Sequence, residues 1–124
     1  MKRETSTYER IMFFSSRFKP MYFAFQIKLL DILSADQLKK TFPALRHRFP
    51  SSAVKVVIEP DKKQYVTTEN VDEYPVTVEP AFADWRVVTA AELSKPFDDS
   101  NGPMVKFSLI HTDSTTDLVV FFQH

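Results

Sequence analysis

Asp117-Leu-Val-Val-Phe-Phe-Gln-His124 is the stretch that says most about this fold, because five consecutive apolar residues lead toward a histidine. A run of this length, rich in β-branched and aromatic residues, is typical of a strand buried on both faces of a sheet. A polar residue at the exit of such a strand stands where α/β enzymes commonly place catalytic groups. The sequence therefore predicts a buried strand over about residues 118–123 and makes His124 a candidate site residue.

The segments upstream add further strands. Gly102-Pro103 opens a strand over about 104–111, and the short connection at 112–116 favours an antiparallel pair. Aromatic and β-branched residues predict other strands over 21–30, 53–59, 64–67 and 76–78. The last of these is bracketed by Pro75 and Pro80, so we expect an edge strand.

Three capping-box spacings mark the expected helices. Helices are predicted over 6–14, over 35–42, and from Thr89 to a point before Pro96. Pro43 lacks an N–H and breaks the second helix at Phe42, so a new helical turn begins there. The fold class that follows is α/β, with a mixed, mostly antiparallel sheet and flanking helices.

Composition bounds the function. The 124 residues (1–124) form a single domain by length, and 16 basic against 16 acidic residues leave no net field that would favour nucleic acid. There is no cysteine and no apolar run that approaches a membrane span, so a cytoplasmic location is the expectation. A single glycine excludes glycine-rich phosphate loops, and His47 and His111 have no metal-ligand spacing, so no metal is predicted.

Four segments together resemble the N-terminal half of a known enzyme group. In chain order they are Tyr8-Glu9-Arg10, Leu38…Phe42-Pro-Ala-Leu-Arg46…Phe49, Pro96-Phe-Asp98…Gly102-Pro103 and Leu118 to His124. The group is the chloramphenicol acetyltransferase-like superfamily, which includes condensation domains and alcohol acyltransferases. One departure is Phe42, which stands where the group usually has a histidine.

The resemblance implies roles for two residues. In that group the last strand enters a His-His-x-x-x-Asp-Gly motif, so His124 is expected to be the first histidine and the base to be the residue after it. The alternative is that Gln123 replaces the first histidine and His124 is itself the base. Arg46 matches the inward-pointing arginine that pairs with the motif aspartate. Without the resemblance, His124 reads as a frayed end and Arg46 as part of a solvated basic run.

The resemblance also implies an activity. The whole protein would move an acyl group from a coenzyme A or carrier-protein thioester to a small-molecule alcohol or amine, with no permanently bound cofactor. This chain would be the truncated N-terminal half, inactive without a missing C-terminal half, and its exposed strand edges are expected to pair between copies. Two rival hypotheses remain: a complete small α/β binding or interaction module, and a non-catalytic scaffold of the condensation type.

Overall fold

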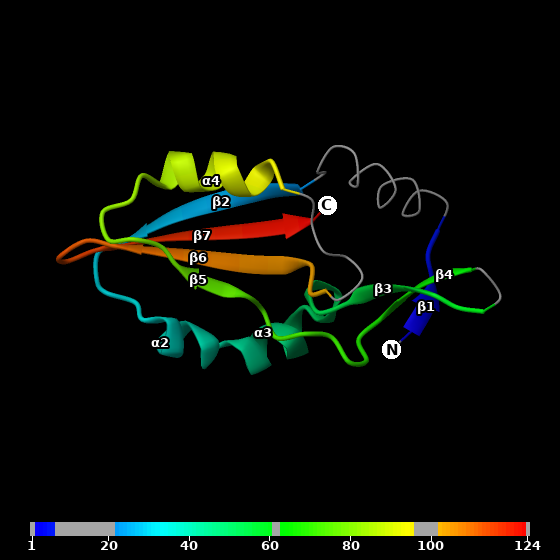
Figure 1. Cartoon of the computed structure of the whole chain (residues 1–124). Coiled ribbons are helices and arrows are strands. Elements are labelled where there is room, and N and C mark those ends of the chain that lie inside the picture. The colour runs from blue at the N-terminus through cyan, green and yellow to red at the C-terminus, as the bar shows by residue number, and fades with distance from the viewer. Residues whose placement is uncertain (1, 7–21, 61–62, 96–101, 124) are drawn as a thin grey trace.

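The computed structural model describes residues 2–6, 22–60, 63–95 and 102–123. Its larger part is a four-stranded sheet in the order β2-β7-β6-β5 (Figure 1). The strands are β2 (Tyr22–Leu29), β5 (Val76–Val78), β6 (Val105–His111) and β7 (Thr116–Gln123). β5 runs parallel to β6 and the other pairs are antiparallel, so the sheet is mixed as predicted.

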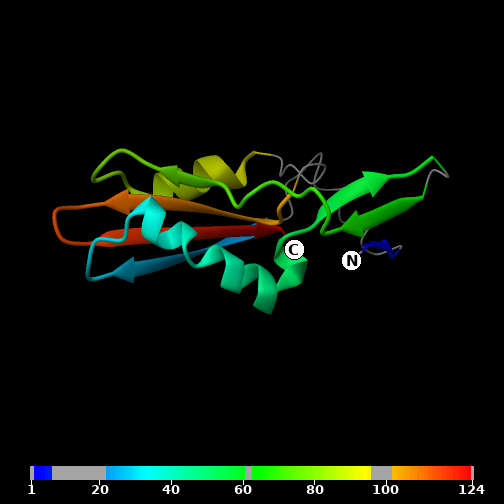
Figure 2. The same cartoon turned by 90° about the horizontal axis from the view of Figure 1, so that it is seen from below.

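Helices cover both faces of this sheet (Figures 1 and 2). They are α2 (Ala35–Lys39), α3 (Phe42–Arg48) and α4 (Trp85–Leu93), with a 3₁₀ turn, η1 (Pro50–Ser52), after α3. On one face Leu38 and Phe42 pack on Phe107 and Leu109. On the other face Trp85 and Leu93 of α4 pack against Val119 and Phe121, both fully buried. The strand β7 is therefore buried on both faces, as its sequence predicts.

A second, three-stranded antiparallel sheet lies at one end of the molecule (Figures 1 and 2). It has the order β1-β4-β3, with β1 (Lys2–Glu4), β3 (Lys55–Ile58) and β4 (Gln64–Thr67). Its small core consists of Val54, Val56, Val66 and Met104. The hairpin of β3 and β4 was predicted. β1 was not, because three charged residues carry no strand pattern.

The capping chemistry that defines α2 is present in full. Ser34 accepts a hydrogen bond from the Gln37 N–H, and the Gln37 side chain accepts one from the Ser34 N–H. α2 then ends at Lys39, and α3 starts at Phe42 with Pro43 in its first turn. The predicted new helical turn with Pro43 near its start is confirmed, but the second helix ends at Lys39, three residues before the expected Phe42.

The start predicted for the third helix is wrong. α4 begins at Trp85, four residues before Thr89, and its N-cap is Asp84, whose side chain accepts a hydrogen bond from the Arg86 N–H. Aspartate is a preferred N-cap residue, and Asp84 therefore sets the start of α4. The helix predicted over 6–14 lies outside the described residues apart from Ser6, and Pro96 to Asp98 also lies outside them.

Candidate functional site

Arg46 lies on the inner side of α3, one turn after the buried Phe42. Residues four apart share a helix face, so the two side chains point the same way. His47 and Arg48 are exposed, whereas the Arg46 side chain is 36% exposed. The basic run is thus divided: two residues face water, and Arg46 faces the segment that leads into β5.

Arg46 makes three kinds of contact with that segment. Its Nη2 donates to the Glu73 carboxylate at 2.9 Å and to the Asp72 carbonyl at 3.2 Å. Its guanidinium carbon lies 5.2 Å from the centroid of the Tyr74 ring. Its Nε is buried and has no hydrogen-bond partner among the described residues. A buried donor left without an acceptor is costly, so Arg46 retains one N–H suited to a further acceptor.

Tyr74 connects Arg46 to the centre of the molecule. The ring is buried and packs on Phe42 and Phe107, with centroid distances of 5.0 Å and 6.1 Å. Its hydroxyl shares a hydrogen bond with Ser52 Oγ. The guanidinium of Arg46 therefore rests on a rigid aromatic cluster that reaches β6.

A small cavity of about 230 Å³ lies beside Arg46. Its walls come from the end of α3 and from the segment after β4, and the lining residues are Arg46, Pro50, Ala53, Thr68 and Val71. Sites for small molecules usually measure about 300–1,000 Å³. This cavity therefore lies below the usual size range of a small-molecule site.

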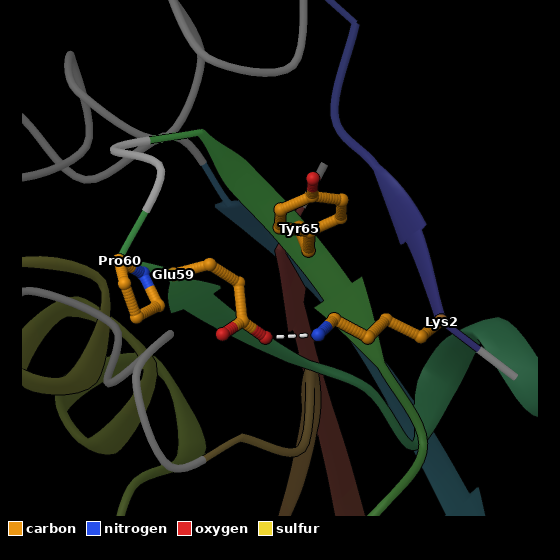
Figure 3. Close-up of a pocket in the computed structure, with 4 residues that line it drawn as sticks. All are labelled: Lys2, Glu59, Pro60 and Tyr65. Carbon is orange, nitrogen blue, oxygen red and sulfur yellow. Dashed lines mark hydrogen bonds and ion pairs between the residues drawn. The ribbon is translucent and has the colours of Figure 1, made fainter.

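A second, more open depression of about 510 Å³ lies on the three-stranded sheet (Figure 3). Lys2 Nζ lies 4.9 Å from the centroid of the Tyr65 ring and forms an ion pair with Glu59. Figure 3 shows Lys2 and Glu59 pointing toward one another. No sequence pattern predicts this site, because its residues meet only through the pairing of β1 and β3 with β4. The two charges neutralise each other, which makes a structural role the simplest interpretation.

His124 lies outside the described residues, so its place in a histidine motif stays a prediction. What the structure describes is the strand before it. β7 pairs with β2 on one side and β6 on the other. Leu118 and Val120 pack on the core of α2 and α3, while Val119 and Phe121 pack toward α4. Residues 118–121 of β7 are thus held by a strand on each side and by a core on each face.

The backbone at Gly102 shows why a glycine stands at the start of the strand predicted after Gly102-Pro103. Its φ is +62°, and a Cβ there would lie 2.3 Å from the Val54 carbonyl oxygen. Only glycine fits that approach. The Met104 N–H then donates to the Ser52 carbonyl at 2.9 Å. The chain's one glycine therefore anchors the start of β6 to the turn that carries Ser52.

The other two histidines, His47 and His111, lie in different environments. The His111 Nε2–H donates to the Leu33 carbonyl at 2.7 Å, and His47 is exposed on α3. Within the described ranges no group of acidic or histidine side chains is arranged to hold a metal ion. In the same ranges no helix is long and apolar enough to cross a membrane.

Glu92 of α4 is tied to two lysines. Its carboxylate accepts hydrogen bonds from Lys106 Nζ at 2.8 Å and Lys95 Nζ at 3.2 Å. Burial of the carboxylate raises its pKa, but the hydrogen bonds and charges of the two lysines outweigh this and hold the pKa of Glu92 below 4.5. The ion pair between Glu92 and Lys106 fastens α4 to β6.

No family model matches this chain, and no curated protein matches it. Solved structures do match. The starter condensation domain of rhizomide synthetase RzmA is similar over 100% of this chain and 32% of its own, with a TM-score of 0.75 and 11% identity. Tallysomycin biosynthesis protein TlmII is similar over 99% and 31%, with a TM-score of 0.70 and 20% identity. The epimerization domain from the third module of tyrocidine synthetase B is similar over 100% and 30%, with a TM-score of 0.74 and 15% identity.

Identities this low show the fold alone. The chain has the chloramphenicol acetyltransferase-like fold of condensation domains, and it spans about a third of the length of these neighbours. The fold predicted from the four sequence segments is confirmed, and the coverage fits the N-terminal half of the two-half fold.

Proposed function

We propose that this chain is the N-terminal part of an acyltransferase that moves an acyl group from a thioester to an alcohol or amine. The observation that carries the proposal is the likeness of the entire chain to condensation domains of which it covers about a third. One such structure, a variant of the same RzmA domain, is a complex with C8-CoA and Leu-SNAC. Coenzyme A or a carrier protein would present the acyl thioester here, with no permanently bound cofactor.

The chemistry needs one base. As the acceptor's oxygen or nitrogen attacks the thioester carbonyl, a neutral imidazole removes its proton, and the thiolate leaves when the tetrahedral intermediate collapses. Histidine suits this step because its unperturbed pKa lies near 6.5. No acyl-enzyme forms, which agrees with a chain that has no cysteine.

His124 is proposed as the first histidine of the motif, with the base directly after it. In the alternative, Gln123 replaces the first histidine of the motif and His124 is itself the base, so the chemistry is the same. Arg46 is proposed as a positioning residue that holds the motif's aspartate. Its buried Nε, which lacks an acceptor among the described residues, supports this role.

The proposal assigns the rest of the site to a C-terminal half of the same protein, located in the cytoplasm. Of the two cavities described above, neither is built to enclose a thioester and an acceptor together. The 124-residue chain as a single domain is therefore expected to be inactive alone.

A second candidate is a protein of the same fold that is a non-catalytic scaffold or that catalyses a different reaction. The tyrocidine synthetase epimerization domain shares the fold with a TM-score of 0.74, so the fold alone does not specify acyl transfer. A small binding or interaction module is the remaining alternative.

The test compares the 124-residue chain with the longest protein that its gene encodes. Each is mixed with C8-CoA and Leu-SNAC, and release of the free coenzyme A thiol is measured beside the amide product. We expect transfer by the longer protein alone. Replacement of the proposed base by alanine is expected to reduce the rate about 10²–10⁴-fold. Arg46→Lys is the matched positioning variant, expected to lower kcat with little change in KM.

Three results would overturn the proposal. The first is a gene that encodes nothing beyond residue 124, which would leave the binding module. The second is a longer protein whose motif lacks both histidines, which would leave the non-catalytic scaffold. The third is unchanged transfer after both histidines are replaced.

A further inference from the structure

Three consecutive residues of the segment between β4 and β5 contact Arg46 near the end of α3 (Figure 1). The Asp72 carbonyl and the Glu73 carboxylate both accept from one nitrogen of the guanidinium, Nη2. The third contact is the Tyr74 ring, whose centroid lies 5.2 Å from the guanidinium carbon. Hydrogen bonds to a single nitrogen fix one point of the planar group, so the ring is needed to fix its orientation.

The turn after β4 directs this segment toward α3. Asn70 has a φ of +55°, in the left-handed region that asparagine tolerates better than most residues. Its carbonyl accepts a hydrogen bond from Lys55 Nζ of β3 at 3.1 Å. Thr67 Oγ1 of β4 accepts one from the Glu69 N–H at 3.1 Å. The turn is therefore tied to both strands of the hairpin, and it sets the course of residues 72–74 past α3.

The Tyr74 side chain is fixed at both ends. Its ring is 2% exposed and packs on Phe42 and Phe107. Its hydroxyl forms a hydrogen bond with Ser52 Oγ, which itself donates to the Phe49 carbonyl at 2.7 Å. A hydroxyl has one proton to donate, so Tyr74 is the donor to Ser52. The ring beside Arg46 is thus immobilised by the core and by the turn that follows α3.

We propose that Tyr74 is a positioning residue, whose ring holds the Arg46 guanidinium in the one orientation that suits the motif aspartate. This inference rests on the proposed function, in which Arg46 holds that aspartate. Tyr74 would touch neither substrate nor base and would act only through Arg46. A small displacement of a positioning group lowers the rate of the chemical step far more than it weakens substrate binding.

The kinetic test uses the longest protein that the gene encodes, with C8-CoA and Leu-SNAC as substrates. Tyr74→Leu should lower kcat about 10–100-fold with little change in KM. Tyr74→Phe, which keeps the ring and removes the hydroxyl, should stay close to the parent. In a protein that already carries Arg46→Ala, Tyr74→Leu should have no further effect on kcat, because residues that act through one another are not additive.

Phe107→Leu is the matched control. It removes a ring from the same core, and among the described residues only Tyr74 places a ring against Arg46. We expect this variant to be less stable than the parent while its kcat stays close to the parent value. Circular dichroism verifies that every variant remains folded.

A second measurement decides the position of Arg46 without any catalysis. NMR of isotope-labelled arginine, in the 124-residue chain and in the longer protein, detects the Arg46 Nε–H. Because this nitrogen is buried, its proton should exchange slowly with water. Slow exchange should persist in Tyr74→Phe and be lost in Tyr74→Leu. A parent protein that transfers no acyl group would contradict the proposed function, whereas the NMR result alone decides whether Tyr74 orients Arg46.

Four results would overturn the inference. They are an unchanged kcat in Tyr74→Leu, additive losses of kcat in the double variant, an equal loss of kcat in Phe107→Leu, and slow exchange of the Arg46 Nε–H that survives Tyr74→Leu.

Discussion

Arg46 contacts a carboxylate and an aromatic ring, and the two contacts contribute different amounts to the free energy of unfolding. The ion pair with Glu73 joins side chains that are 36% and 61% exposed. Pairs as exposed as this contribute about 0–1 kcal/mol. The ring of Tyr74 is buried, and a cation over such a ring contributes about 0.5–2 kcal/mol. The ring is therefore the stronger anchor of Arg46.

This difference gives a prediction for two single variants. Glu73→Gln should lower the free energy of unfolding by less than about 0.5 kcal/mol, because an exposed ion pair is weakly stabilising. Arg46→Ala should lower it by about 1–2 kcal/mol, because the contact with the ring and the packing of the stem are both lost. Urea unfolding followed by circular dichroism measures both. Equal losses would show that the carboxylate, not the ring, holds the arginine.

The candidate site could be predicted from the sequence only in part. The resemblance implies an inward-pointing Arg46, and the structure places its side chain, 36% exposed, against the segment before β5; its role in the site stays a prediction. Its partners Glu73 and Tyr74 could not be foreseen, because they lie in an irregular segment whose approach depends on the packing of Tyr74 against Phe107. The place of His124 in the motif stays a prediction.

At the level of elements, the start of α4 is set by a side chain rather than by a spacing. Thr89 and Glu92 have the capping-box spacing, yet both lie inside the helix. Asp84 caps the helix instead. Thr89 Oγ1 is buried and without a hydrogen-bond partner among the described residues. A capping motif in the sequence therefore predicts the wrong helix start where a stronger N-cap lies upstream. β7 could be predicted because its long apolar run is compatible with few other structures.

Two variants separate these positions. Asp84→Ala should lower the free energy of unfolding by about 1 kcal/mol, because the first turn loses its cap. Thr89→Ala should leave the stability unchanged or raise it slightly, because alanine is the better helix former and a partnerless hydroxyl is removed. Thermal unfolding compares the two variants directly. A larger loss for Thr89→Ala would mean that the helix begins at residue 89 in solution.

The attachment of α4 to β6 should depend on pH. The lysines lower the pKa of Glu92 in the folded chain below 4.5. The unfolded chain therefore binds the proton more readily, so the stabilisation is complete above the unfolded pKa and is lost as the pH falls through the folded pKa. We expect Glu92→Gln to cost about 1 kcal/mol at neutral pH, with the difference from the parent chain shrinking below pH 4.5. Lys106→Met should remove most of the same pH dependence, and a difference that persists in acid would contradict the assignment.

At the scale of the whole molecule, the two sheets have separate and unequal cores. The four-stranded sheet is packed between helices on both faces, with a core on each. The three-stranded sheet depends on four buried residues, of which Met104 comes from the chain entering β6. Gly102 and the Met104 N–H join the two parts at that point. The larger sheet should therefore be the stable unit on which the smaller one depends.

Amide hydrogen exchange of the native chain should reveal this order. Regions with few buried apolar contacts open with less free energy than a central core. We expect the amides of β6 and β7 to exchange most slowly and those of β3 and β4 to exchange substantially faster. Val66→Ala, which removes buried volume from the small core alone, should speed exchange in β3 and β4 while leaving β6 and β7 close to their parent rates. Mass spectrometry of the exchanged chain after digestion separates the two sheets. Uniform protection in the parent chain, or uniform loss of protection in the variant, would show that both sheets unfold as one cooperative unit.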